Sequence, residues 1–334
     1  MPTALTITSE ARASAEVPQP LVDPSRPLLT LDDLVRARAS EMGDSPLIGY
    51  PNHSLLDFEE HSARSVDRYV DAAVEKLQQL GLPPVDPSLE KPPVVGILCQ
   101  SGLHVVISII ALNRLGYTVF LISTRLAGPA LDRLIELTGC SAILTTPNFH
   151  ATLAEVPKER QPTLFPTLSR SDYYRKDAPV FSRLCDAEYE SKKIAVILHS
   201  SGSTGLPKPI WLSHKSCIGA FSLNSNMRSL LASPLFHSHG FYEVFRSIYA
   251  RKTIYLANYS LPLTRQSLLK MLDYIKPELF HCVPYLVKLL AESDAGIRAL
   301  AKVNMVLFAG SSCPDDLGDM LVSRGVNLVA NYGA

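Results

Sequence analysis

The chain has 334 residues, 46% hydrophobic and 19% charged, and its 32 basic side chains balance its 32 acidic ones. This composition is typical of a globular protein and lacks the basic excess of nucleic-acid binders. The N-terminus shows no secretory signal, and polar residues interrupt the longest apolar stretch, residues 94–112, before it reaches the roughly 20 residues of a membrane span. We therefore predict a cytoplasmic protein that binds neither nucleic acid nor membrane.

The first half of the chain predicts helices and strands in alternation after a mobile lead-in. Residues 1–27 are rich in Ala, Ser, Thr and Pro and have no periodicity. Apolar residues recur at helical spacing within residues 57–80. A short apolar run at 94–99 is typical of a strand buried on both faces. The other expected elements are helices at 32–39, 102–115 and 128–139 and strands at 118–122 and 142–145.

Residues 147–192 are polar and contain several prolines, so we expect a connecting region there. The alternation then resumes. Strands are expected at 194–198, 253–257, 278–281, 304–308 and 326–330, and helices at 213–224, 240–249, 264–275, 284–293 and 314–323. Such alternation predicts an α/β fold with mainly parallel sheets. We expect two βα-layered subdomains, at residues 28–192 and 193–334.

The string His199-Ser-Ser-Gly-Ser-Thr-Gly-Leu-Pro-Lys208 directly follows the strand expected at 194–198. Small residues allow backbone N–H groups to approach an anion, hydroxyls add donors, and Lys208 adds a cation suited to phosphate. The pattern GxxxxGK[ST] of the common P-loop is absent, as are GxGxxG and GxSxG. A flexible Ser/Gly-rich surface loop is the alternative, but the complete string favours a loop that binds a polyphosphate.

The complete string resembles the signature loop of the adenylate-forming superfamily, which includes acyl-CoA synthetases, luciferases and the adenylation domains of peptide synthetases. It departs from the usual pattern at Pro209, where glycine is common, and at His199, where an aromatic residue is common. The form HSSGSTGLPKPI looks most like the adenylation domain of fungal peptide-synthetase-like enzymes of the carboxylate reductase type. Further segments resemble the superfamily in the same order: 111–123, 234–241, 308–312 and 331–334.

The resemblance implies activation of a carboxylic acid by ATP and Mg²⁺ to an acyl-adenylate. In this reading Thr204, Lys208 and His237 act in catalysis. The nucleotide is bound by Ser200, Ser201, Gly202, Ser203, Thr204, Gly205, Lys208, His237, Asn331 and Tyr332. The acid pocket is formed by His239, Phe241, Ala309, Gly310 and Ser311. An aryl or α-keto acid would be the substrate only by analogy with the fungal enzymes.

Several of these residues have a purely structural interpretation. Phe241 could belong to the core, Gly310 could serve a turn, and Tyr332 could pack at the end of a strand. The pair His237 and His239 could bind a metal, but residues 240–243 supply no convincing further ligand, so we favour a ligand-contacting His237. No metal ligand is predicted within the chain, because the glutamate that the superfamily uses for Mg²⁺ is expected just after Ala334.

The alternation of elements stops directly after a strand, at residues 331–334. We interpret this ending as a truncation and expect no useful rate of acyl-adenylate formation from this chain alone. The acyl acceptor implied by the resemblance is phosphopantetheine on a downstream carrier domain, or CoA. A non-catalytic nucleotide-binding remnant and an interaction module with the same fold remain alternatives, and a serine hydrolase is disfavoured by the missing GxSxG.

Overall fold

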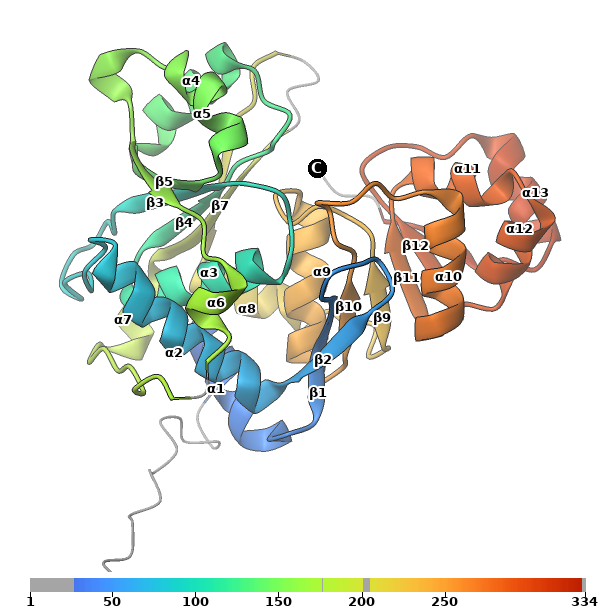
Figure 1. Ribbon diagram of the computed structural model, residues 1–334, viewed down its shortest axis with the longest axis horizontal. Helices are drawn as coiled ribbons and strands as arrows, with labels where there is room; N and C mark the ends of the chain where they lie inside the picture. Colours follow the sequence, from blue (N-terminus) through green and yellow to red (C-terminus); the bar gives the residue numbers. More distant parts are fainter. Residues whose placement is uncertain (1–26, 176, 201–204, 332–334) are drawn as a thin grey trace, which may run out of the picture.

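The computed structural model describes residues 27–175, 177–200 and 205–331 and confirms an α/β fold with two mainly parallel sheets (Figure 1). The lead-in predicted at residues 1–27 lies outside the described residues, apart from Pro27. We name the six-stranded sheet the first sheet and the seven-stranded sheet the second sheet.

The first sheet has the strand order β6-β5-β3-β4-β7-β8. Its strands are parallel except for β8, which pairs antiparallel with β7 at one edge. The three strands β3, β4 and β7 are almost wholly buried, which explains their continuous apolar sequences. The bounds are β3 (Val94–Leu98), β4 (Thr118–Leu121), β5 (Cys140–Thr145), β6 (Thr163–Pro166), β7 (Ile194–His199) and β8 (Pro209–Ser213).

The second sheet has the order β13-β12-β11-β9-β10-β1-β2 and is parallel except for β2, which is antiparallel to β1. In both sheets the antiparallel strand therefore lies at an edge. The bounds are β1 (Pro46–Pro51), β2 (Phe58–Ser62), β9 (Ser229–Leu231), β10 (Ile254–Leu256), β11 (Leu279–Cys282), β12 (Met305–Phe308) and β13 (Leu328–Ala330).

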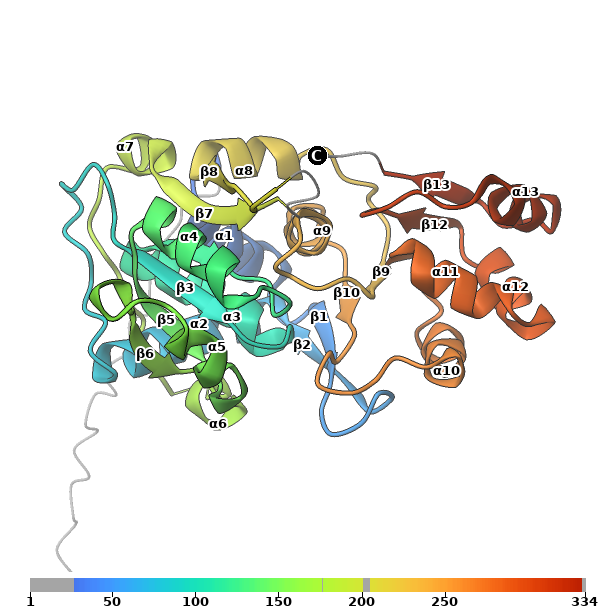
Figure 2. The same cartoon turned by 90° about the horizontal axis from the view of Figure 1, so that it is seen from above.

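Helices cover both sheets, and one of them, α9 (Ser238–Tyr249), lies between β7 of the first sheet and β9 of the second in both views (Figures 1 and 2). The earlier helices are α1 (Leu31–Met42), α2 (Ala63–Gln79), α3 (Leu103–Leu115), α4 (Gly128–Thr138), α5 (His150–Ala154), α6 (Arg170–Tyr173), α7 (Ala187–Lys192) and α8 (His214–Phe221). The later helices are α10 (Arg265–Ile275), α11 (Pro284–Ala291), α12 (Asp294–Ala301) and α13 (Asp315–Ser323). Two short 3₁₀ helices are η1 (Pro147–Phe149) and η2 (Lys158–Arg160).

The expected subdomain boundary at residues 192/193 does not separate the strands of the two sheets. The β1–β2 hairpin precedes residue 192 but joins the second sheet, whereas β7 and β8 follow residue 193 and complete the first sheet. Each sheet therefore contains strands from both sides of residue 192. The two subdomains at residues 28–192 and 193–334 remain a prediction.

The long helix predicted at residues 57–80 begins later than expected. Residues Phe58–Ser62 form β2, and α2 begins at Ala63 after Ser62, whose side chain accepts a hydrogen bond from the backbone N–H of Ser65. The carboxylate of Asp57 instead accepts hydrogen bonds from the backbone N–H groups of His53 and Ser54, so it stabilises the β1–β2 turn. An aspartate can accept backbone hydrogen bonds either at the N-terminus of a helix or in a turn, so the sequence around Asp57 fits both.

The interface between α1 and α8 depends on a neutral histidine. His214 in the first turn of α8 is buried, and its Nδ1 accepts a hydrogen bond of 3.2 Å from the backbone N–H of Leu31. Burial lowers the pKa of His214 to about 4, against the opposing effect of Glu190 and Asp32. Protonation would break the hydrogen bond and leave a buried charge.

We therefore expect acid to destabilise the chain through His214. Its folded-state pKa is below the ordinary value of about 6.5, so its stabilising contribution is complete above that pH and is lost as the pH falls toward 4. Between pH 7 and pH 5 this group alone should remove about 2 kcal/mol of unfolding free energy. Urea unfolding should show a weaker pH dependence for His214→Gln than for the parent chain and for the exposed-site control His150→Ala. Equal slopes for all three would contradict this role.

Candidate adenylate site

The predicted phosphate loop connects β7 to β8 in an antiparallel hairpin rather than leading into a helix. His199 pairs with Pro209 across the two strands. The backbone N–H of Ser200 donates to the carbonyl of Lys208, and the backbone N–H of Lys208 donates to the hydroxyl of Ser200, both at 3.0 Å. These two bonds close the base of the loop. Pro209 is tolerated there because it is the first residue of an edge strand.

His199 anchors the start of this loop, a role that the sequence did not reveal. Its Nε2 accepts a hydrogen bond of 3.1 Å from the backbone N–H of Ser123, and its Nδ1 lies 2.9 Å from the carbonyl oxygen of Ser200. The ring also meets Phe120 edge to face. Burial lowers the pKa of His199, although the bond to Ser200 opposes the shift. A neutral ring with its proton on Nδ1 satisfies both contacts.

His237 lies at the N-cap of α9 and faces the same region. It is partly buried, with its ring 4.6 Å from that of Phe236. Burial lowers the pKa of His237 to about 4, and the positive charge of Arg125 acts in the same direction. The contact of His237 with a ligand shared with the loop stays a prediction.

The other predicted positions follow the carboxyl ends of parallel strands in the second sheet, the edge at which ligands bind in open α/β sheets. Ala309, Gly310 and Ser311 come directly after β12, and Asn331 follows β13, with its backbone N–H donating to the carbonyl of Phe308. Gly310 and Ser311 are exposed, whereas Ala309 is buried. The φ angle of +95° at Gly310 explains the glycine as a turn residue.

Phe241 lies in the core rather than at a ligand surface. Its ring is fully buried and packs against Phe221 and Phe245 at centroid distances of 5.9 and 5.0 Å. This position supports the structural interpretation of Phe241, and we assign the residue to the packing of α9 on α8. The predicted ligand contacts of Ser201, Gly202, Ser203, Thr204 and Tyr332 lie outside the described residues. Gly205 and Lys208 are described and exposed.

Gly240 fixes how closely α9 approaches the segment that precedes it. A Cβ atom at this position would lie 2.0 Å from the backbone carbonyl oxygen of Pro234, which also accepts a hydrogen bond from the N–H of His237. Only glycine fits, since backbone rather than a flexible side chain would have to move. The absence of a side chain at Gly240 therefore holds His237 and His239 in place.

We expect Gly240→Ala to lower the free energy of unfolding by about 1–3 kcal/mol, as overpacking of a core does. The matched control is Gly219→Ala in α8, where an added Cβ has no neighbour within 4 Å. That substitution should be neutral or stabilising by up to about 1 kcal/mol. Urea denaturation of both variants measures the difference, and equal stabilities would contradict the close approach.

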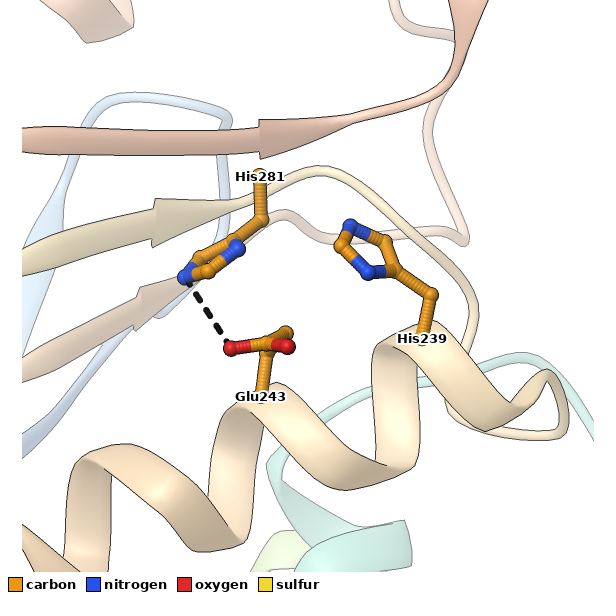
Figure 3. A group of neighbouring side chains, drawn as sticks. All are labelled: His239, Glu243 and His281. Carbon is orange, nitrogen blue, oxygen red and sulfur yellow. Dashed lines mark ion pairs between the residues drawn. The ribbon is translucent and has the colours of Figure 1, made fainter. Parts of the chain in front are cut away.

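His239 lies one turn before Glu243 on α9, and both side chains point toward His281 on β11 (Figure 3). All three residues are buried, and one ligand atom from each lies within 4.8 Å of the others. Glu243 thus lies beside His239 and His281, although the sequence interpretation found no convincing ligand in residues 240–243. Its spacing of four residues from His239 was the available signal, whereas His281 is brought near only by the fold.

The comparisons with known proteins agree with this fold and show the family. Residues 38–334 match the family described as AMP-binding enzyme, and the chain belongs to this family. The chain is 26% identical over 259 residues to a carboxylic acid reductase of Neurospora crassa and 27% identical over 268 residues to the adenylate-forming reductase stbB of Stachybotrys bisbyi. These alignments cover 71% and 77% of the chain but only 24% and 22% of the relatives. The chain thus spans about a quarter of their length.

Solved structures show the same fold at low sequence identity. The N-terminal subdomain of NpsA from Klebsiella oxytoca, in complex with 3-hydroxybenzoyl-AMSN, has a TM-score of 0.72 at 16% identity, covering 92% of this chain and 73% of that one. The N-terminal domain of FACL13 from Mycobacterium tuberculosis, bound to an inhibitor, has a TM-score of 0.73 at 16% identity, with coverage of 91% and 76%. Within the described part of the chain, the helices are too short or too polar to cross a membrane.

Proposed function

We propose that the chain binds ATP at the β7–β8 loop and activates a carboxylic acid as an acyl-adenylate, as part of a peptide-synthetase-like or acyl-CoA-synthetase-like enzyme. The observation that carries the proposal is the β7–β8 loop, a segment rich in Ser, Gly and Thr that directly follows a buried strand and ends in Lys208. Two hydrogen bonds between Ser200 and Lys208 close the base of this loop. Membership of the AMP-binding enzyme family supports the same reaction.

In the proposed reaction a carboxylate oxygen attacks the α-phosphorus of ATP. The new bond joins this oxygen to phosphorus, and the bond to the bridging oxygen breaks, so that pyrophosphate leaves with its electron pair. The chain has to hold two anions together and offset their repulsion, which is orientational and electrostatic work. Lys208 would hold the leaving phosphates, and His237, which burial keeps neutral, would hydrogen-bond the adenylate.

The proposed reaction also requires a metal ion, an acyl acceptor and a binding position for the acid. Mg²⁺ would neutralise part of the phosphate charge, and phosphopantetheine on a carrier domain or CoA would accept the acyl group. We place the acid beside His239 and the segment 309–311, at the carboxyl edge of the second sheet. An aryl acid is a reasonable first substrate to test, because NpsA was solved with a hydroxybenzoyl compound.

The test is a calorimetric titration of the chain with ATP and Mg²⁺, followed by pyrophosphate exchange in the presence of a panel of aryl and α-keto acids. We expect saturable binding of one ATP per chain. Acid-dependent exchange would establish activation, whereas binding without exchange would support the nucleotide-binding remnant. If circular dichroism shows a folded chain that binds no ATP, both the activating enzyme and the nucleotide-binding remnant are contradicted. The interaction module would then be the alternative that remains.

A further inference from the structure

We propose that His239, Glu243 and His281 form a binding site for a divalent transition-metal ion, with Zn²⁺ as the best-fitting ion. Figure 3 shows the two residues of α9 and the one residue of β11 pointing at a common centre. The two imidazole rings have a centroid distance of 5.5 Å and are tilted by 66°, so they are not stacked on each other. This site shares His239 with the proposed acid pocket but includes none of the residues proposed to bind ATP.

The hydrogen-bonding state of the two histidines points to a ligand. His239 and His281 are only 7% and 2% exposed. Within the described part of the chain neither nitrogen of His239 has a hydrogen-bond partner, and Nδ1 of His281 also has none. Buried polar groups normally have partners, and each exception calls for an explanation such as a missing ion. A metal ion would satisfy one nitrogen of each ring.

The distances suit a small ion after modest side-chain rotation. Zinc binds histidine nitrogen and carboxylate oxygen at about 2.0–2.2 Å, which puts two ligand atoms of a tetrahedral site roughly 3.4 Å apart. Nε2 of His281 lies 3.6 Å from Oε2 of Glu243, close to that value, and the whole set lies within 4.8 Å. Two imidazoles with one carboxylate form a donor set that favours zinc and other transition ions over Mg²⁺ or Ca²⁺.

Arg246 orients the carboxylate of Glu243. Its guanidinium donates to Oε1 of Glu243 at 2.6 Å and to the carbonyl of Ala220 at 3.3 Å, which leaves Oε2 directed toward His281. Outer hydrogen bonds of this kind commonly fix the ligands of a metal site.

The experiment uses the chain without a polyhistidine tag, stripped with a chelator and then titrated with ZnCl₂ by calorimetry. Co²⁺ absorbance serves as a second probe of coordination geometry. We expect one Zn²⁺ per chain and a rise in melting temperature on binding. His239→Gln, Glu243→Gln and His281→Gln should each weaken binding at least 10-fold, whereas the exposed His150→Gln should leave it unchanged.

Circular dichroism shows which variants are folded. The substitution Glu243→Gln nearly preserves the side-chain volume, so it still tests the site if a histidine variant unfolds. The proposal is overturned if the parent chain binds no Zn²⁺, or if binding survives in Glu243→Gln and the folded histidine variants. Loss of binding in His237→Gln and His239→Gln, with binding kept in Glu243→Gln and His281→Gln, would also overturn it, because the metal would then be held by the His237/His239 pair. ATP titration of the metal-free chain is a separate readout, so failure of one proposal does not decide the other.

Discussion

Replacing Arg114 by Ala should lower the free energy of unfolding by about 3–5 kcal/mol, because it removes a buried guanidinium that three carboxylates share. The guanidinium, 1% exposed in α3, donates from Nε to Asp32 at 2.6 Å, from Nη2 to Asp67 at 2.5 Å and from Nη1 to Asp71 at 2.7 Å. It thereby ties α3 to α1 and α2. The positive charge of Arg114 also affects the titration of Asp32. Burial acts to raise the pKa of Asp32, but Arg114 and Arg36 hold it below its usual range.

The control for this prediction is Arg133→Ala. Arg133 forms an exposed ion pair with Glu136, and such pairs contribute about 0–1 kcal/mol. Without Arg114 the buried carboxylates should take up protons more readily, so the difference between variant and parent should be smaller at pH 5 than at pH 7.5. Urea denaturation at both pH values measures this. A loss below about 1 kcal/mol at pH 7.5 would show that the cluster does not stabilise the three-helix contact.

Replacing Lys208 by Ala should raise the dissociation constant for ATP about 10- to 100-fold, the loss expected for a hydrogen bond to a charged group. The backbone of Lys208 is held by Ser200 at the base of the loop, while its side chain is exposed. In the described part of the chain this ammonium has no ion-pair partner. It can therefore reach a phosphate without first breaking another interaction.

The matched control is Lys215→Ala, which removes an equally exposed lysine from the first turn of α8. Calorimetry should show unchanged ATP affinity for this variant. Lys208→Arg should keep part of the affinity, because the positive charge remains but its geometry differs. If the Lys208→Ala and Lys215→Ala variants bound ATP equally well, the proposed phosphate contact would be wrong, whatever the absolute affinity.

The order of helices and strands could largely be predicted because buried strands such as β3 and β4 are continuously apolar and helices such as α10 keep an amphipathic period. The edge strands β2 and β8 could not, although the edge strand β13 was expected at residues 326–330. In β2 and β8 no residue other than His61 is buried, so their sequences carry no strong apolar signal, and only pairing with a neighbour makes them strands. The boundary between subdomains is also hidden in the sequence, because β1, near the start of the chain, belongs to the same sheet as the late strands β9 to β13.

The site was predictable to the extent that it lies in short continuous motifs. The strand before the loop and the placement of His237 at a helix start follow from the sequence, and the structure has both. The partners of Arg114, the anchoring of the loop by His199 and the meeting of Glu243 with His281 join distant segments. Such contacts depend on tertiary packing and leave no local pattern. The contacts of residues 201–204 and Tyr332 remain predictions.

The most direct test of the central claim is the binding of a non-hydrolysable aroyl-adenylate analogue, compared with AMP and with the free aryl acid. If nucleotide and acid are bound side by side between the β7–β8 loop and the carboxyl edge of the second sheet, the joined molecule should bind at least about 100-fold more tightly than either part, because one association cost serves both contacts. Calorimetry on the chain gives the three dissociation constants. An analogue that binds no better than AMP would contradict an adenylate site.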